Sequence, residues 1–244
     1  MIYKRLIQSL LLFVLASTAH AGWDDFLDIF TDQSAKLTES TALENKDIVA
    51  GLKEALIKGS KSAVSTLGKP NGFLSHPKLK IPMPEKLQAV ESGLRKLGQD
   101  ELADEFVVSL NRAAEKAVPK AMDIFGNTIR SMSIEDAYAV LKGSDTAATD
   151  YLREHSGAEL QQAFLPIVKQ ATASVGVTDK YKNLIDKLGV MANFIDVESL
   201  DIDQYVTGKA MDGLFTLVAS EEKQIRENPA ARTSEILKKV FSAN

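Results

Sequence analysis

Residues 100–131, DELADEFVVSLNRAAEKAVPKAMDIFGNTIRS, decide the fold class of this chain. Their apolar side chains recur with the period of a helix, and no part of the segment alternates as a strand would. Pro119, near the middle, has no backbone N–H to donate and therefore kinks or splits a helix that contains it. The sequence predicts one long helical stretch over 100–131, kinked or divided at Pro119.

The same helical period extends along most of the chain, and residues that end helices separate the periodic segments. Helices are predicted over 22–30, 41–67, 84–97, 100–131, 133–142, 146–155, 158–174, 179–188, 202–227 and 231–242. No window of about four to eight residues shows strand alternation with turn residues on both sides. The predicted fold is all-α, an irregular multi-helix bundle of about eight to eleven helices.

Residues 68–84 interrupt the helices and hold four of the seven prolines of the chain. These are Pro70, Pro77, Pro82 and Pro84. Proline donates no backbone hydrogen bond and disfavours helical backbone in the residue before it. Residues 79–81 alternate in polarity, but they are too few and too close to prolines to form a central strand. An ordered loop or hinge between two helical sections is expected here, or alternatively the boundary of an N-terminal helical arm.

The composition is that of an ordinary globular protein. The 244 residues are 45% hydrophobic and 25% charged, with 29 basic and 33 acidic side chains. These values exclude collagen-like, low-complexity and disordered chains. A pI near 5.5 argues against a nucleic-acid partner, because neutralising phosphates requires a basic face. The absence of cysteine excludes disulfides, thiolate metal sites and cysteine nucleophiles.

Residues 1–21 have the three parts of a secretory signal peptide. Lys4 and Arg5 form the charged start, and an apolar run too short to span a bilayer follows. Ala19 and Ala21 then provide the small residues that signal peptidase requires. Cleavage is predicted after Ala21, and an uncleaved N-terminal anchor is the alternative.

Cleavage would leave residues 22–244 as a single all-helical domain in the periplasm of a Gram-negative bacterium. Loss of two basic residues leaves 27 basic against 33 acidic side chains, a net charge of −6. No later stretch approaches the roughly 20 apolar residues of a membrane-spanning helix, so no transmembrane anchor is predicted after cleavage.

The common catalytic motifs are absent, including His-Glu-x-x-His, Gly-x-Ser-x-Gly and the phosphate-binding loop. Ser75 and Lys78 match a Ser-x-x-Lys pattern, but they lie among prolines and not on the helix that this motif requires. His76 and His155 are isolated, and a zinc site needs more ligands than they provide. The sequence therefore predicts no catalytic residue, no metal ligand and no cofactor.

An acidic cluster over residues 196–203 invites a calcium hypothesis. An EF-hand loop that begins at Asp196 would need glycine and glutamate where Asp201 and Thr207 stand. Asp201 is instead predicted to cap the following helix, with Gln204 as its partner three residues later.

Two stretches combine polar side chains with small residues. Asn111 and Glu115 share one helical face, with Arg112 beside them, and Glu222 and Arg226 form an i, i+4 pair. Each stretch is predicted either as a solvated or interhelical salt-bridge face or as a polar cluster that forms a binding site. The candidate binding residues are Asn111, Arg112, Glu115, Tyr151, Asp212, Glu222, Arg226 and Arg232.

Several short motifs, in the same order, resemble those of one exported bacterial family. They are SLNRAAE at 109–115 with Pro119 after it, Asp136-Ala137 with Leu141-Lys142-Gly143, AATDY at 147–151, Tyr205-Val206-Thr207, AMDGLF at 210–215, and residues 221–232 followed by LKKVF at 237–241. From about residue 45 to the C-terminus, the chain resembles the domain-of-unknown-function 4197 family. The resemblance implies a helical protein of the bacterial envelope and transfers no catalytic residue.

Two functions from different classes are consistent with the sequence. The first is a non-enzymatic binding or interaction module for a partner protein or an apolar small ligand. Such a ligand would occupy a pocket between helices, lined by residues such as Phe106, Leu110, Phe164, Leu214 and Phe215. The alternative is a hydrolase-like enzyme with a carboxylate, tyrosine and arginine site assembled from several helices. Its candidates are Glu115, Asp145, Tyr151, Asp212, Glu222 and Arg226. The oligomeric state is left open.

Overall fold

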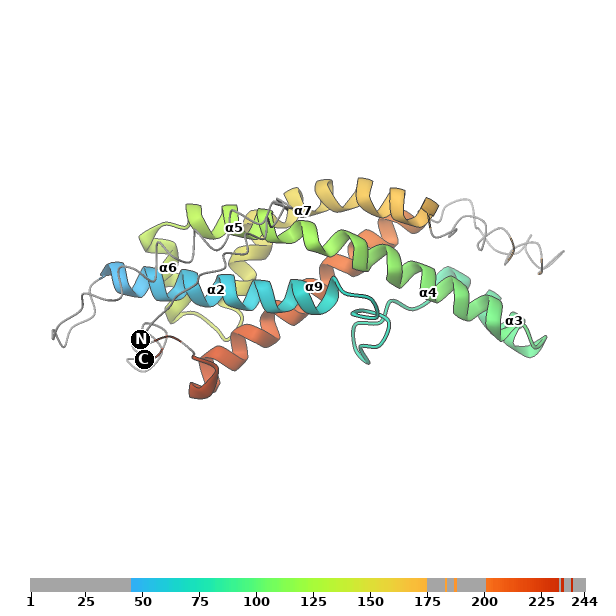
Figure 1. Cartoon of the computed structure of the whole chain (residues 1–244), viewed down its shortest axis with the longest axis horizontal. Coiled ribbons are helices and arrows are strands. Elements are labelled where there is room, and N and C mark those ends of the chain that lie inside the picture. Colours follow the sequence, from blue (N-terminus) through green and yellow to red (C-terminus); the bar gives the residue numbers. More distant parts are fainter. Residues whose placement is uncertain are drawn as a thin grey trace, which may run out of the picture. The chain divides into compact units, whose positions relative to one another are not determined.

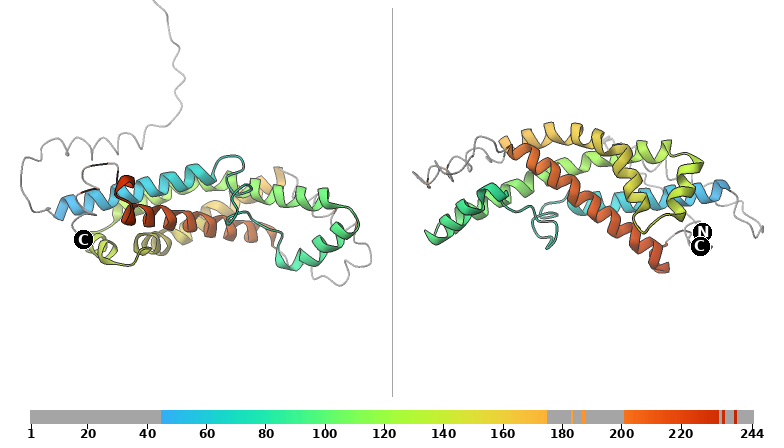
Figure 2. Two further views of the ribbon diagram at one scale, coloured as in Figure 1. Left: turned by 90° about the horizontal axis from the view of Figure 1, so that it is seen from below. Right: turned by 180° about the vertical axis from the view of Figure 1, so that it is seen from behind.

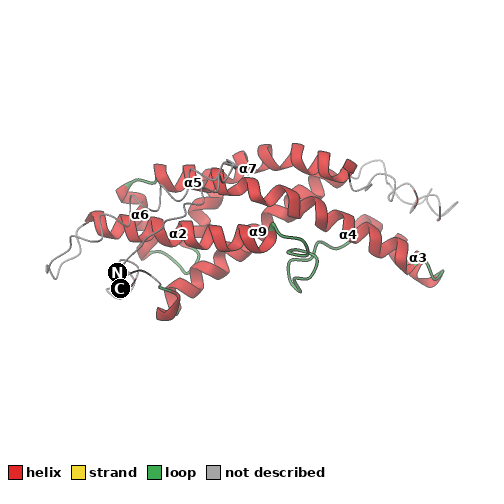
Figure 3. Cartoon of the chain, in the orientation of Figure 1, coloured by secondary structure: helices red, strands yellow, loops and turns green. Residues whose placement is uncertain are grey.

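The structure, a computed structural model, describes residues 45–174 and 201–232, together with Asn183, Lys187, Ser234 and Lys238. The chain divides into two units, Met1–Thr41 and Ala42–Asn244, and every described residue belongs to the second. Every regular element in the described residues is a helix, which confirms the all-α prediction (Figure 1 and Figure 3). The predicted signal peptide, the predicted helix over 22–30 and most of the predicted helices over 179–188 and 231–242 lie outside the described residues.

The helices of the described residues differ widely in length. The α-helices are α2 (Asn45–Leu67), α3 (Gln88–Lys96), α4 (Asp100–Ala117), α5 (Ala121–Ser131), α6 (Ile134–Lys142), α7 (Ala147–Ser174) and α9 (Ile202–Glu227). Short 3-10 helices are η2 (Glu85–Leu87), η3 (Val118–Lys120) and η5 (Pro229–Ala231). The predicted number of eight to eleven helices is not confirmed.

The long helices α2, α4, α7 and α9 surround the core. Helix α9 packs against α7, α2 and α4, and it crosses α2 at an angle (Figure 2, right). Fully buried aromatic side chains fill the space between the helices, including Phe106, Phe125, Phe164 and Phe215. The rings of Phe125 and Phe215 meet in a tilted arrangement with their centroids 5.7 Å apart, which aromatic pairs favour.

Local signals account for several helix boundaries. The 3-10 helix η3 separates α4 from α5 at Pro119, so the predicted split is confirmed. Ser133 and Asp136 form the reciprocal capping box that begins α6. The carboxylate of Asp201 accepts the backbone N–H of Gln204 at 2.9 Å, which caps α9 as predicted.

The predicted break between helices over 146–155 and 158–174 is wrong, because α7 continues through Gly157. A glycine inside a helix costs only about 1 kcal/mol relative to alanine. Leu152 and Leu160, on either side of it, are both fully buried. Their packing outweighs the weak preference of glycine for a break.

Candidate functional site

Asn111 of α4 is fully buried and holds the backbone of residue 81. Its side-chain oxygen accepts the N–H of Ile81 at 2.9 Å, and its amide nitrogen donates to the carbonyl of Ile81, also at 2.9 Å. The same nitrogen donates to the carbonyl of Val107 at 2.8 Å. Both backbone groups of Ile81 are therefore satisfied by one side chain from another element.

Glu115 lies one turn further along α4 and holds the other end of the same loop. Its Oε1 accepts the backbone N–H groups of Phe73 at 3.2 Å and Leu74 at 3.4 Å. Its Oε2 accepts Nη1 of Arg112 at 2.7 Å, so the charge of this buried carboxylate is balanced. The Nη2 of Arg112 reaches the side-chain oxygen of Asn71 at 2.7 Å.

Residues 68–84 thus form an ordered loop between α2 and η2, as one of the predicted alternatives states, and we call it loop 68–84. Its inward side chains Phe73, Ile81 and Met83 are buried. Tyr205 of α9 donates its hydroxyl to the carbonyl of Pro82 at 3.0 Å. Burial, together with the negative charge of Glu85, raises the pKa of Tyr205 above its ordinary value. The loop is therefore held from two sides, by α4 and by α9.

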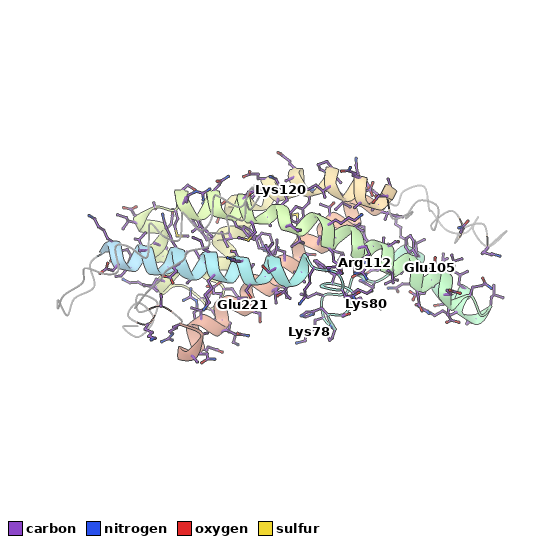
Figure 4. The ribbon with its side chains drawn as sticks, viewed as in Figure 1. Lys78, Lys80, Glu105, Arg112, Lys120 and Glu221 are labelled. Carbon is purple, nitrogen blue, oxygen red and sulfur yellow. The ribbon has the colours of Figure 1, made fainter. Side chains whose placement is uncertain are left out.

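The outward side of loop 68–84 remains exposed although its backbone is fixed. Figure 4 shows Lys78 and Lys80 on this loop and Arg112 on α4. The exposed residues of the loop are Lys69, Pro70, Asn71, Ser75, Pro77, Lys78, Lys80 and Pro82.

The close packing of Phe73 against α9 leads to a prediction about Gly213. A Cβ atom at Gly213 would lie 2.6 Å from Cε1 of Phe73, whereas one at Gly208, on the same helix, would meet nothing within 4 Å. Gly213→Ala is expected to lower the free energy of unfolding by about 1–3 kcal/mol through overpacking. Gly208→Ala is expected to raise it by about 0.5–1 kcal/mol through helix propensity. Urea unfolding of both variants checks this, and equal effects at the two positions would contradict it.

The second polar stretch, Glu222 and Arg226 of α9, connects α9 to the ends of two other helices. Glu222 of α9 is buried, and its two oxygens accept the backbone N–H groups of Ala148 at 3.0 Å and Thr149 at 2.9 Å. The hydroxyl of Thr149 also donates to it, at 2.8 Å. These N–H groups belong to the first turn of α7, where a helix has no acceptors of its own and where negative charge is favourable.

Arg226 connects this pair to a third helix, α6. Its Nε and Nη2 donate to Oε1 of Glu222 at 3.0 and 2.8 Å. Its guanidinium also donates to the carbonyls of Val140 at 2.9 Å and Leu141 at 3.3 Å, in the last turn of α6. Arg232 similarly donates to the carbonyls of Ile225 and Arg226 at the end of α9. The pair Glu222–Arg226 therefore connects the ends of α6 and α7 to α9.

The other two candidate binding residues lie elsewhere. Tyr151 stacks on His155 with ring centroids 4.1 Å apart, and burial together with the charge of Asp136 raises its pKa. Asp212 has an exposed side chain, 3.9 Å from Nη1 of Arg153. The eight candidates thus form two separate groups and two single positions. In the part of the chain that the structure describes, no three His, Asp or Glu side chains could hold a metal ion.

A pocket lies between α2, α9 and the first turn of α7. Its empty volume is about 320 Å³, part of which is open solvent, and its lining is mostly apolar. It is lined by Leu52, Ala55, Leu56, Gly59, Ala148, Val218, Glu222, Ile225 and Arg226. The aromatic and leucine side chains expected to line a pocket are instead fully buried in the core. They are Phe106, Leu110, Phe164, Leu214 and Phe215.

Sequence reasoning missed two residues that shape loop 68–84. Asn71 has a positive φ of 67°, which asparagine tolerates better than most residues. The order Pro70-Asn71-Gly72 is typical of a turn and was the available signal. Tyr205 carries no comparable signal, because its partner carbonyl is 123 residues away in sequence.

The described residues define a class of protein: all-helical, with buried polar side chains that join helix ends and hold an exposed loop. None of these helices is long and apolar enough to cross a membrane. The chain belongs to the DUF4197 family of proteins of unknown function, whose model matches residues 42–242. The match confirms the resemblance found in the sequence motifs. No curated protein and no solved structure matches the chain.

Proposed function

We propose that this protein is a periplasmic, non-enzymatic interaction module that presents loop 68–84 to a partner protein. One observation carries the proposal: buried polar groups fix the backbone of a loop whose outer side is exposed. Loops on a rigid scaffold are common binding elements. A loop that is already ordered loses less conformational entropy on binding than a flexible one.

The chemistry of the two buried carboxylates supports a structural role for each. The oxygens of Glu115 and Glu222 already accept backbone N–H groups and a guanidinium. A carboxylate that acts as a general acid or base must exchange protons with a substrate, which these contacts oppose. No observation on the described residues favours the hydrolase-like alternative.

The periplasmic part of the proposal rests on the signal-peptide pattern of residues 1–21. Cell fractionation of the producing bacterium tests it, together with the mass of the mature chain. A mature chain that begins at Gly22 and is released with the periplasmic fraction would support this location. A full-length chain in the cytoplasmic fraction would contradict it.

Photocrosslinking from loop 68–84 tests the partner. A photoreactive phenylalanine analogue replaces Ser75, which is exposed on the loop, and the full chain is expressed in its own bacterium. The same analogue at Gln161, exposed on α7, serves as the control. A discrete protein adduct from position 75 and none from position 161 is the expected result. Equal labelling at both positions, or none at position 75, would contradict the proposal.

The pocket between α2 and α9 supports a second candidate function, binding of a small apolar ligand. The observation that favours it is the mostly apolar lining, because ligand pockets are lined predominantly by apolar side chains. Native mass spectrometry of the protein from its own compartment separates the two functions. A reproducible extra mass that is lost on denaturation would favour the ligand, and a bare mass would favour the partner protein.

A further inference from the structure

We propose that loop 68–84 binds an acidic segment of its partner protein. This inference rests on the proposed function and adds the chemistry of the partner. Its basis is the charge of the loop, which is opposite to that of the whole chain.

The sequence around the loop is free of negative charge. Between Glu54 and Glu85 there are five lysines, one histidine and no acidic residue, although the whole chain has a net charge of −4. Positive charge is therefore concentrated in one segment of an acidic protein.

The structure leaves three of these lysines available for a partner. Lys69, Lys78 and Lys80 are exposed, and within the described residues their ammonium groups make no hydrogen bond or ion pair. Arg112 adds no net charge, because it is paired with Glu115. Because the loop is held by Asn111 and Glu115, the three ammonium groups extend from a fixed backbone.

A protein partner fits this surface better than a lipid membrane does. Membrane-binding basic segments use clusters of about 4–8 lysines or arginines, usually with an apolar anchor. Loop 68–84 has three unpaired lysines. The large hydrophobic side chains that are exposed among the described residues are Leu97 and Ile134, and neither belongs to the loop.

A nucleic-acid partner fits less well for a related reason. Single-stranded nucleic acids bind to aromatic side chains on which their bases stack. The one aromatic residue of loop 68–84 other than its histidine is Phe73, which is fully buried. Carboxylates of a protein segment need only ammonium groups at suitable positions, and the resulting attraction increases both the rate and the selectivity of binding.

The test uses the full chain and a fluorescein-labelled peptide of ten glutamates as the probe. Fluorescence anisotropy is measured at about 20 mM salt, where screening is weak. The wild-type protein is expected to bind the peptide despite its own negative charge. The variant K69E/K78E/K80E is expected to bind at least about tenfold more weakly, and added salt should weaken wild-type binding.

A matched control variant separates the effect of the loop lysines on binding from the effect of the net charge of the protein. K46E/K96E/K169E makes the same change in charge at exposed lysines outside the loop, and its affinity is expected to stay within about twofold of wild type. Circular dichroism should show both variants folded, since the ammonium groups of the six lysines make no hydrogen bond or ion pair within the described residues. No binding by wild type, or equal losses in both variants, would overturn the proposal. Binding to phosphatidylglycerol vesicles and not to the peptide would also overturn it.

The variant K69E/K78E/K80E, combined with the photocrosslink from position 75, shows whether this inference or the proposed function fails. If the adduct from position 75 persists when K69E/K78E/K80E is introduced, a partner exists but is not recognised by its acidic groups. If the adduct is absent in the otherwise wild-type chain, the partner proposal itself fails.

Discussion

Glu222→Ala is expected to lower the free energy of unfolding by about 3–5 kcal/mol, the range for breaking a buried ion pair. The change leaves the guanidinium of Arg226, whose side chain is only 12% exposed, without its counter-charge. It also removes the acceptor for the N–H groups of Ala148 and Thr149 in the first turn of α7. Urea unfolding of the full chain, followed by circular dichroism, measures the change.

Two variants make this measurement specific. Glu227→Ala removes a carboxylate from the same helix, but that side chain is 58% exposed and lies 3.6 Å from Lys223. Its expected effect is below about 1 kcal/mol. The double variant E222A/R226A is expected to cost less than the sum of the two single changes, because it leaves no buried charge unpaired. Additive losses, or a loss in E222A no larger than in E227A, would mean that the pair does not join these helices.

Asn111→Ala has the second largest expected effect, about 2–4 kcal/mol. The change leaves the buried N–H and carbonyl of Ile81 without their partner and opens a small cavity beside α4. Its effect should be concentrated in loop 68–84. Hydrogen exchange measured by mass spectrometry is therefore expected to accelerate in peptides that cover this loop before it changes in α7.

The control for this change is Asn127→Ala, at an exposed asparagine of α5 that accepts a hydrogen bond from Arg130. Its expected effect is within about 0.5 kcal/mol of zero, as for most surface substitutions. If N111A leaves exchange in the loop unchanged, then Asn111 does not hold the loop, and the basis of the proposed function is removed.

Local signals in the sequence predicted the all-helical class and several helix boundaries. Pro119 and the cap at Asp201 both act within a few residues, so their effects can be predicted without knowledge of the fold. The break expected near Gly157 failed because distant packing outweighed a weak local preference.

The role of the polar residues could be predicted only in part. Helical spacing placed Asn111 and Glu115 on one face, and it paired Glu222 with Arg226. It could not show what they contact. The loop partners of Asn111 and Glu115 lie 30 to 42 residues away in a segment without periodicity, and the α7 partners of Glu222 lie 73 and 74 residues away. Contacts at such separations depend on tertiary packing, which leaves no period in the sequence.

The pairing of α2 with α9 has a consequence for how the chain is made. Ser62 donates to Glu221 at 2.7 Å, and Lys58 donates to the carbonyl of Ala231 at 2.8 Å, across 159 and 173 residues of sequence. A chain that emerges from the ribosome presents α2 long before α9. The apolar side of α2 therefore stays without this cover until α9 has also been synthesised. The contacts between α2 and α9 are therefore among the last that a growing chain can form.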